Sequence, residues 1–99
     1  MFDGQKYATK GVVSDIPPYL QSLMWHNISK LEIEKDYLQV FKLEVAEIDG
    51  KPAQKMIHTQ EQPPYSKEYV FAVGEAPVAA KIFVIDDESH CTMLLASEY

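Results

Sequence analysis

The fold is decided by the stretch Lys81-Ile82-Phe83-Val84-Ile85-Asp86-Asp87-Glu88-Ser89-His90-Cys91-Thr92-Met93-Leu94-Leu95-Ala96. An apolar run, a polar turn and a second apolar run are typical of a β-hairpin, here with strands at residues 80–85 and 91–96. Such a hairpin satisfies burial when its strands lie inside the protein and its charged turn lies in water. We therefore expect a buried set and an exposed set: Ile82, Val84, Met93 and Leu95 buried, Asp87 and Glu88 exposed.

A second hairpin is predicted around Asp49-Gly50, because a type I′ turn needs positive φ at both positions. With that turn, residues whose numbers sum to 99 face one another. Apolar-side pairs then fall on one face and an opposite-charge pair on the other, so the register is self-consistent. These pairs are Leu43 with Met56, Phe41 with His58, and Glu44 with Lys55.

One helix is expected, from Tyr19 to about Glu34, where apolar residues recur at helical spacing. Pro18 suits the first helical position, because its missing N–H would be unpaired there anyway. The other apolar segments read as strands, beginning with residues 6–13. The sequence therefore predicts one α+β domain over residues 1–99, in the order β-α-β-β-β-β-β.

This fold is a single amphipathic helix packed on a mostly antiparallel five- to six-stranded sheet. One helix covers only one sheet face. The second face then either curls back into a partial barrel or meets a partner.

Composition excludes several classes of function. The net charge is −6, and all nine basic residues are lysines, so neither a nucleic-acid-binding face nor attraction to an anionic membrane is expected. One cysteine cannot form an internal disulfide, and we find neither a secretory signal nor a membrane-spanning run. We expect a cytoplasmic protein without a cofactor, since so small a core leaves little room for one.

Five segments together resemble a known family: residues 7–17, 36–41, 81–87, 89–90 and 92–96. The family is the uncharacterised domain of unknown function 960, found in low-GC Gram-positive bacteria, their phages and mobile elements. The resemblance spans nearly the whole chain. It implies a source and a length class, and it brings no activity, catalytic residue or cofactor.

The turn at residues 86–90 gathers carboxylates and an imidazole, which are metal ligands and acid–base groups. One hypothesis is therefore a small metal-dependent or hydrolytic enzyme that uses Asp86, Asp87 and His90, with His58 nearby. The alternative is a solvated turn, since neighbouring side chains in a short turn diverge. Cys91 shares its strand face with apolar residues and is expected to be a buried structural thiol. We assign no catalytic residue and no metal ligand.

Tyrosine and tryptophan are favoured in protein interfaces, because one end of each side chain is apolar and the other is polar. The leading hypothesis is a non-enzymatic protein-interaction or regulatory module of unknown partner, with a homodimer as one form. A third hypothesis is an acidic mobile-element protein that mimics nucleic acid. The candidate interaction residues are Tyr19, Trp25, Tyr65, Tyr69, Asp87, Glu88 and His90.

Overall fold

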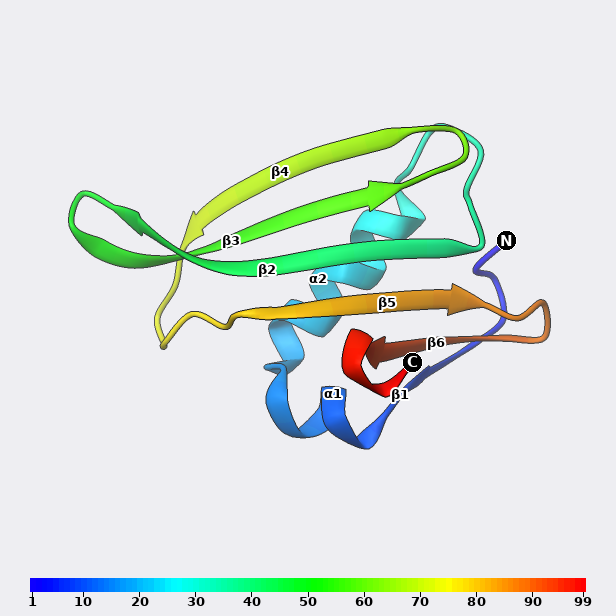
Figure 1. Ribbon diagram of the computed structural model, residues 1–99, viewed down its shortest axis with the longest axis horizontal. Coiled ribbons are helices and arrows are strands. Elements are labelled where there is room, and N and C mark those ends of the chain that lie inside the picture. Colours follow the sequence, from blue (N-terminus) through cyan, green and yellow to red (C-terminus); the bar gives the residue numbers. More distant parts are fainter.

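The computed structural model describes residues 1–99 and contains one six-stranded sheet with two α-helices (Figure 1). The elements in chain order are β1 (Gln5–Ala8), α1 (Lys10–Asp15), α2 (Pro18–Ser29), β2 (Leu38–Ile48), β3 (Lys51–Gln60), β4 (Tyr65–Ala72), β5 (Ala80–Asp86), β6 (His90–Leu95) and the 3-10 turn η1 (Ala96–Glu98).

The strands lie in the order β1-β6-β5-β2-β3-β4, so β1 and β4 are free edges and the sheet does not close into a barrel. Four neighbouring pairs are antiparallel, and β1 runs parallel to β6. The α+β class is thus confirmed, but the sheet is mixed and carries two helices instead of one. In the sequence, both helices lie between β1 and β2. This long connection allows β1 to pair with the last strand, β6, in parallel orientation.

The predicted β2–β3 register is confirmed. All paired residues sum to 99, from Val40 with Thr59 to Ile48 with Lys51. Asp49 and Gly50 have φ angles of 52° and 77°, the left-handed backbone that the turn requires.

The predicted first strand is wrong beyond Ala8. Residues Lys10–Asp15 form α1 instead, and Thr9 begins it as the N-cap, its hydroxyl accepting from the Val12 amide at 3.3 Å. The Thr9 hydroxyl also donates to the Glu98 carboxylate at 2.6 Å. These contacts, together with complete burial of Val12, override the strand preference of the β-branched pair Val12-Val13.

Helix α2 begins at Pro18, as predicted, and ends at Ser29, before the expected Glu34. At its end the Ser29 hydroxyl and the Lys30 amide both donate to the His26 carbonyl, which closes the last turn. Its sheet-facing side buries Leu20, Met24, Asn27 and Ile28.

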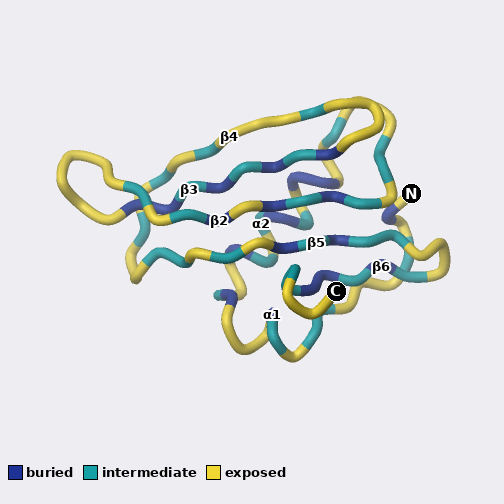
Figure 2. Tube along the Cα trace, viewed as in Figure 1, coloured by how far each residue is buried: buried dark blue, intermediate teal, exposed yellow.

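The core lies between α2 and one face of the sheet, where the dark segments of Figure 2 concentrate. Ile82, Val84 and Met93 are fully buried there, and Asp87 and Glu88 are exposed, as expected. Leu95 is only partly buried, because it ends β6 where the chain turns into η1.

Candidate interaction surface

One face of the sheet carries no α-helix. In Figure 1, α2 lies behind the strands, and the side turned toward the viewer is covered only by the short C-terminal segment, drawn in red. Alternation along the strands places on this face an apolar set that we call the open-face patch: Leu38, Val40, Phe83, Ile85 and Leu94. Val40 faces Phe83, which in turn faces Leu94, and the Tyr99 ring packs edge-on against Phe83 at 5.4 Å.

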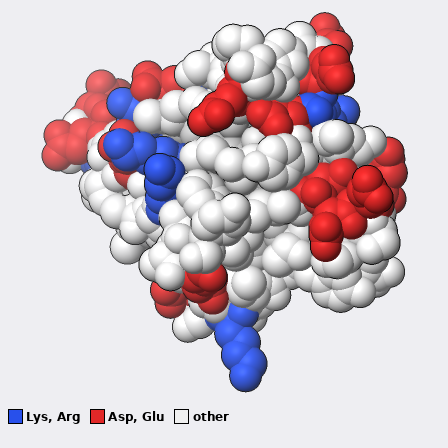
Figure 3. Space-filling model, turned by 45° about the vertical axis from the view of Figure 1, so that its right-hand side comes forward, with Lys and Arg blue, Asp and Glu red and all other residues white.

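A charged strip borders the open-face patch. The Glu44 carboxylate lies 3.5 Å from the Lys42 ammonium and 3.9 Å from that of Lys55, which also lies 3.1 Å from Glu68. Lys81 is in no ion pair, and its ammonium lies 5.6 Å from the Phe83 ring centre. Figure 3 shows an uncharged area with blue side chains on one side and red ones on the other. The strip holds three lysines and two glutamates, so it is locally positive in an acidic chain.

The aromatic residues singled out from the sequence do not form one surface. Tyr19 lies in the first turn of α2 and is partly exposed beside the segment Ala72–Glu75, while Trp25 is half-buried on the opposite flank of the helix. Tyr65 and Tyr69 lie on the helix-facing side of β4. Asp87, Glu88 and His90 lie at the β5–β6 turn.

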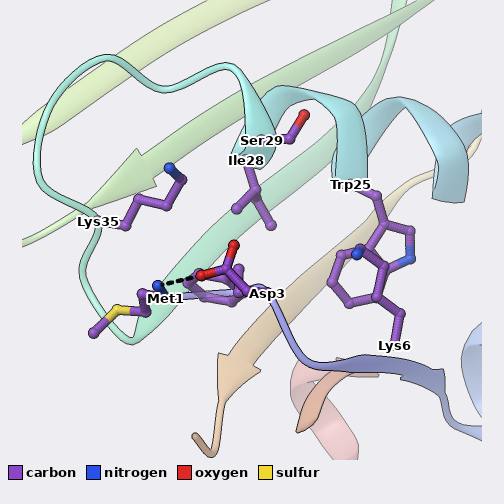
Figure 4. A pocket seen from close by; sticks show the side chains of 8 residues that line it. Met1, Asp3, Lys6, Trp25, Ile28, Ser29 and Lys35 are labelled. Carbon is purple, nitrogen blue, oxygen red and sulfur yellow. Dashed lines mark hydrogen bonds and ion pairs between the residues drawn. The ribbon is translucent and has the colours of Figure 1, made fainter.

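A small cavity of about 110 Å³ lies beside Trp25 (Figure 4). The Lys6 ammonium lies 5.8 Å from the Trp25 ring centre, and the amino terminus donates to the Asp3 carboxylate at 3.0 Å. That hydrogen bond lowers the pKa of Asp3. The cavity is smaller than the roughly 300 Å³ at which small-molecule sites begin.

The acidic turn shows local contacts only. The His90 Nε2 atom lies 3.6 Å from the Asp87 carboxylate, and the Tyr7 ring packs edge-on against the His90 ring at 5.6 Å. No three or more His, Cys, Asp or Glu residues are arranged to hold a metal. His58 lies three strands away, about 14 Å across the sheet, with its side chain on the other face. The structure therefore does not bring His58 to this turn.

Cys91 is fully buried, as expected. Its Sγ atom lies 3.6 Å from the Gln5 carbonyl oxygen, and burial raises the pKa of the thiol. The protonated thiol thus donates weakly to the β1 backbone, a structural role.

The sequence did not predict a buried chain of hydrogen bonds that joins Gln60, Gln39 and His58. The Gln60 amide donates to the carbonyl oxygens of Glu34 and Pro63, and Gln60 Oε1 accepts from the Gln39 amide at 2.6 Å. Gln39 Oε1 lies 2.6 Å from His58 Nε2. Period-two spacing could have revealed these residues, since they occupy the same face of their strands as the apolar core residues.

His58 is the inner end of this chain. Its ring stacks on Phe41 with centres 4.2 Å apart, which confirms the expected packing on an apolar face. Burial, followed by the charge of Lys30, lowers the pKa of His58 to about 4, so the imidazole is neutral at pH 7.

The fold and surfaces define an α+β protein with one helix-covered and one open sheet face. The sequence profile of a family described as staphylococcal protein of unknown function (DUF960) matches residues 5–98, and the chain belongs to that family. The predicted resemblance is thus confirmed.

A solved structure is similar to this chain along its length. It is the crystal structure of a protein of unknown function from Enterococcus faecalis, with a TM-score of 0.75 and 28% sequence identity, covering 98% of this chain and 92% of that chain. No curated protein matches the chain. None of its helices has the length and apolar character needed to cross a membrane.

Proposed function

We propose that this protein is a non-enzymatic interaction module of the cytoplasm that docks a protein partner on its open sheet face. The observation that carries the proposal is the open-face patch, which crosses β2, β5 and β6 without a covering α-helix. Four of its side chains are half-buried, and that of Leu94 is buried. Apolar residues gathered on an uncovered face are typical of protein interfaces.

The bordering charges support a partner of particular chemistry. Lys81 has no carboxylate of its own, and Lys42 shares Glu44 with Lys55. A partner surface that is apolar at its centre and acidic at its border would bury the patch and pair these ammonium groups. A second copy of this chain is the alternative occupant, although two chains of charge −6 repel at long range.

The acidic-mimic hypothesis draws less support from the structure. A mimic of nucleic acid presents closely spaced negative charges along one face. On the face shown in Figure 3, the red groups are separated by uncharged and blue areas.

Photo-crosslinking tests the proposal with a matched pair of sites. Val40 and Val45 both lie on β2, but they point to opposite faces of the sheet. We expect a crosslinking amino acid at position 40 to capture one discrete protein in cells that make the chain, and one at position 45 to capture none. Lys81→Glu should abolish the product.

Light scattering of the purified protein then distinguishes a different protein partner from a second copy of this chain. A monomer supports a different protein as partner, whereas a stable dimer that position 40 crosslinks to itself identifies a second copy. Equal capture from both positions, or no capture from position 40, would refute the open face as the docking surface.

A further inference from the structure

A second cavity lies on the helix-covered side of the sheet, between the end of α2 and the start of β4. Its volume is about 430 Å³, within the range of small-molecule sites. It is lined by Lys30, Leu31, Glu32, Ile33, Tyr65 and Lys67.

Two ammonium groups stand at this cavity without ion-pair partners. Those of Lys30 and Lys67 lie 5.3 and 5.4 Å from the ring centre of Tyr69, and no carboxylate lies within ion-pair distance of either. The lining contains one acid, Glu32, against these two lysines. The cavity is therefore positively charged in a chain of net charge −6.

Three residues that neighbour the lining, although they are not part of it, have buried polar atoms without a hydrogen-bond partner. In the whole chain, the buried side-chain atoms without a hydrogen-bond partner belong to Asn27, His58 and Tyr69. Asn27 precedes Lys30 by one helical turn, and His58 packs against the edge of Tyr65 with ring centres 5.3 Å apart. Such groups in native proteins bind a water or a ligand, because a buried group without a partner costs free energy.

The order of donors and acceptors along the buried Gln60–Gln39–His58 network determines which His58 ring nitrogen carries the proton. The Gln39 amide nitrogen donates to Gln60 Oε1 and to the Asp36 carbonyl, so Gln39 presents its oxygen to His58. His58 Nε2 must then carry the proton and donate to that oxygen. In the neutral ring, the remaining nitrogen Nδ1 is an acceptor whose lone pair is unpaired.

We propose that this cavity binds a small organic anion that also carries a hydroxyl group. The ammonium groups of Lys30 and Lys67 hold the carboxylate or phosphate. The hydroxyl group is linked through one water to the buried acceptor of His58, whose ring packs against Tyr65. The apolar side chains of Leu31 and Ile33 cover the carbon skeleton.

Matched probes test the two halves of the proposal. Lactate and propionate have the same charge and nearly the same size, but only lactate carries the hydroxyl. Titrations are followed by NMR at the His58 ring nitrogens and at the Lys30 and Lys67 side chains. We expect lactate to bind more tightly than propionate and to shift the His58 Nδ1 signal, and glycerol, which lacks charge, not to bind.

Substitution of the lysines separates a built site from general electrostatic attraction. Lys30→Gln with Lys67→Gln should weaken lactate binding by about tenfold or more. Lys10→Gln with Lys51→Gln makes the same charge change at exposed lysines outside the cavity, and it should leave binding unchanged.

Three results would overturn the proposal. Equal weakening by both double variants would mean an adventitious ion only. Equal affinity for lactate and propionate would remove the hydroxyl requirement. Tighter binding of a glutamate-rich peptide than of lactate would identify an acidic segment of a partner as the ligand.

Discussion

His58 Nε2 and Gln39 Oε1 lie 2.6 Å apart, and neither side chain is exposed to solvent. This contact is the point where the ordered chain of glutamine amides meets the aromatic stack of the core.

Replacement of Gln39 should destabilise the fold. Gln39→Leu keeps the volume but leaves the His58 Nε2–H without its acceptor and removes one of the donors to Gln60. We expect a loss of about 2–3 kcal/mol in the free energy of unfolding, measured by urea denaturation. Gln5→Leu, at an exposed edge-strand position, serves as the control and should change it by less than about 0.5 kcal/mol. Equal stability of the two variants would contradict a structural role for the buried hydrogen bonds of Gln39.

Stability should decline in acid because of His58. The pKa is about 4 in the folded state against 6.5 for an unperturbed histidine, so the unfolded chain takes up a proton first as the pH falls. The stability from neutral His58 is therefore complete above pH 6.5 and is lost progressively toward pH 4. The expected loss is about 3 kcal/mol.

The comparison with His58→Gln isolates this contribution from that of the carboxylates, which titrate in the same range. The difference between the unfolding free energies of the two proteins should change across this interval. Parallel curves would show that His58 does not titrate differently in the two states.

Two valines provide a matched test of the core. Val84 is fully buried in β5, and Val45 is 61% exposed in β2. Val84→Ala should cost about 1–3 kcal/mol, because it removes buried methyl groups and leaves a cavity. Val45→Ala should stay within about 0.5 kcal/mol. Thermal and urea unfolding measure both, and a similar loss at the two sites would argue against the described packing.

Two glycines give a similar comparison at the sheet edge. A Cβ atom on Gly4 would lie 2.6 Å from the Ser89 carbonyl oxygen, whereas one on Gly74 would meet nothing within 4 Å. Gly4→Ala must push β1 away from the β5–β6 turn, at a cost of about 1–3 kcal/mol. Gly74→Ala should be neutral or stabilising by about 0.4–1 kcal/mol. Hydrogen exchange at the Thr9 amide, which donates to the Met93 carbonyl of β6, should rise only in the Gly4 variant.

Local sequence signals predicted the parts of the fold that depend on local geometry. The Asp49-Gly50 turn determined the whole β2–β3 register, since a shift by one residue would have exposed Phe41 and Leu43. Pro18 likewise marked the start of α2. The final hairpin followed from its two apolar runs.

The errors came from contacts between distant residues. Val12-Val13 favours a strand locally, but the Thr9 cap and the Glu98 carboxylate, 89 positions further along, hold this segment as a helix. The buried glutamines were missed for a similar reason. Glutamine is usually exposed, and only the assembled chain of amides provides its partners.

Because β1 pairs with β6, the first strand to be synthesised must wait for the last one before it can join the sheet. Of the six strands, Gln5–Ala8 is synthesised first, but its strand partner His90–Leu95 is synthesised last. Until then β1 has no neighbour in the sheet, and β5 is paired only with β2. The nascent chain therefore completes its sheet only after β6 has been synthesised, and a chain truncated before His90 cannot hold its first strand in place.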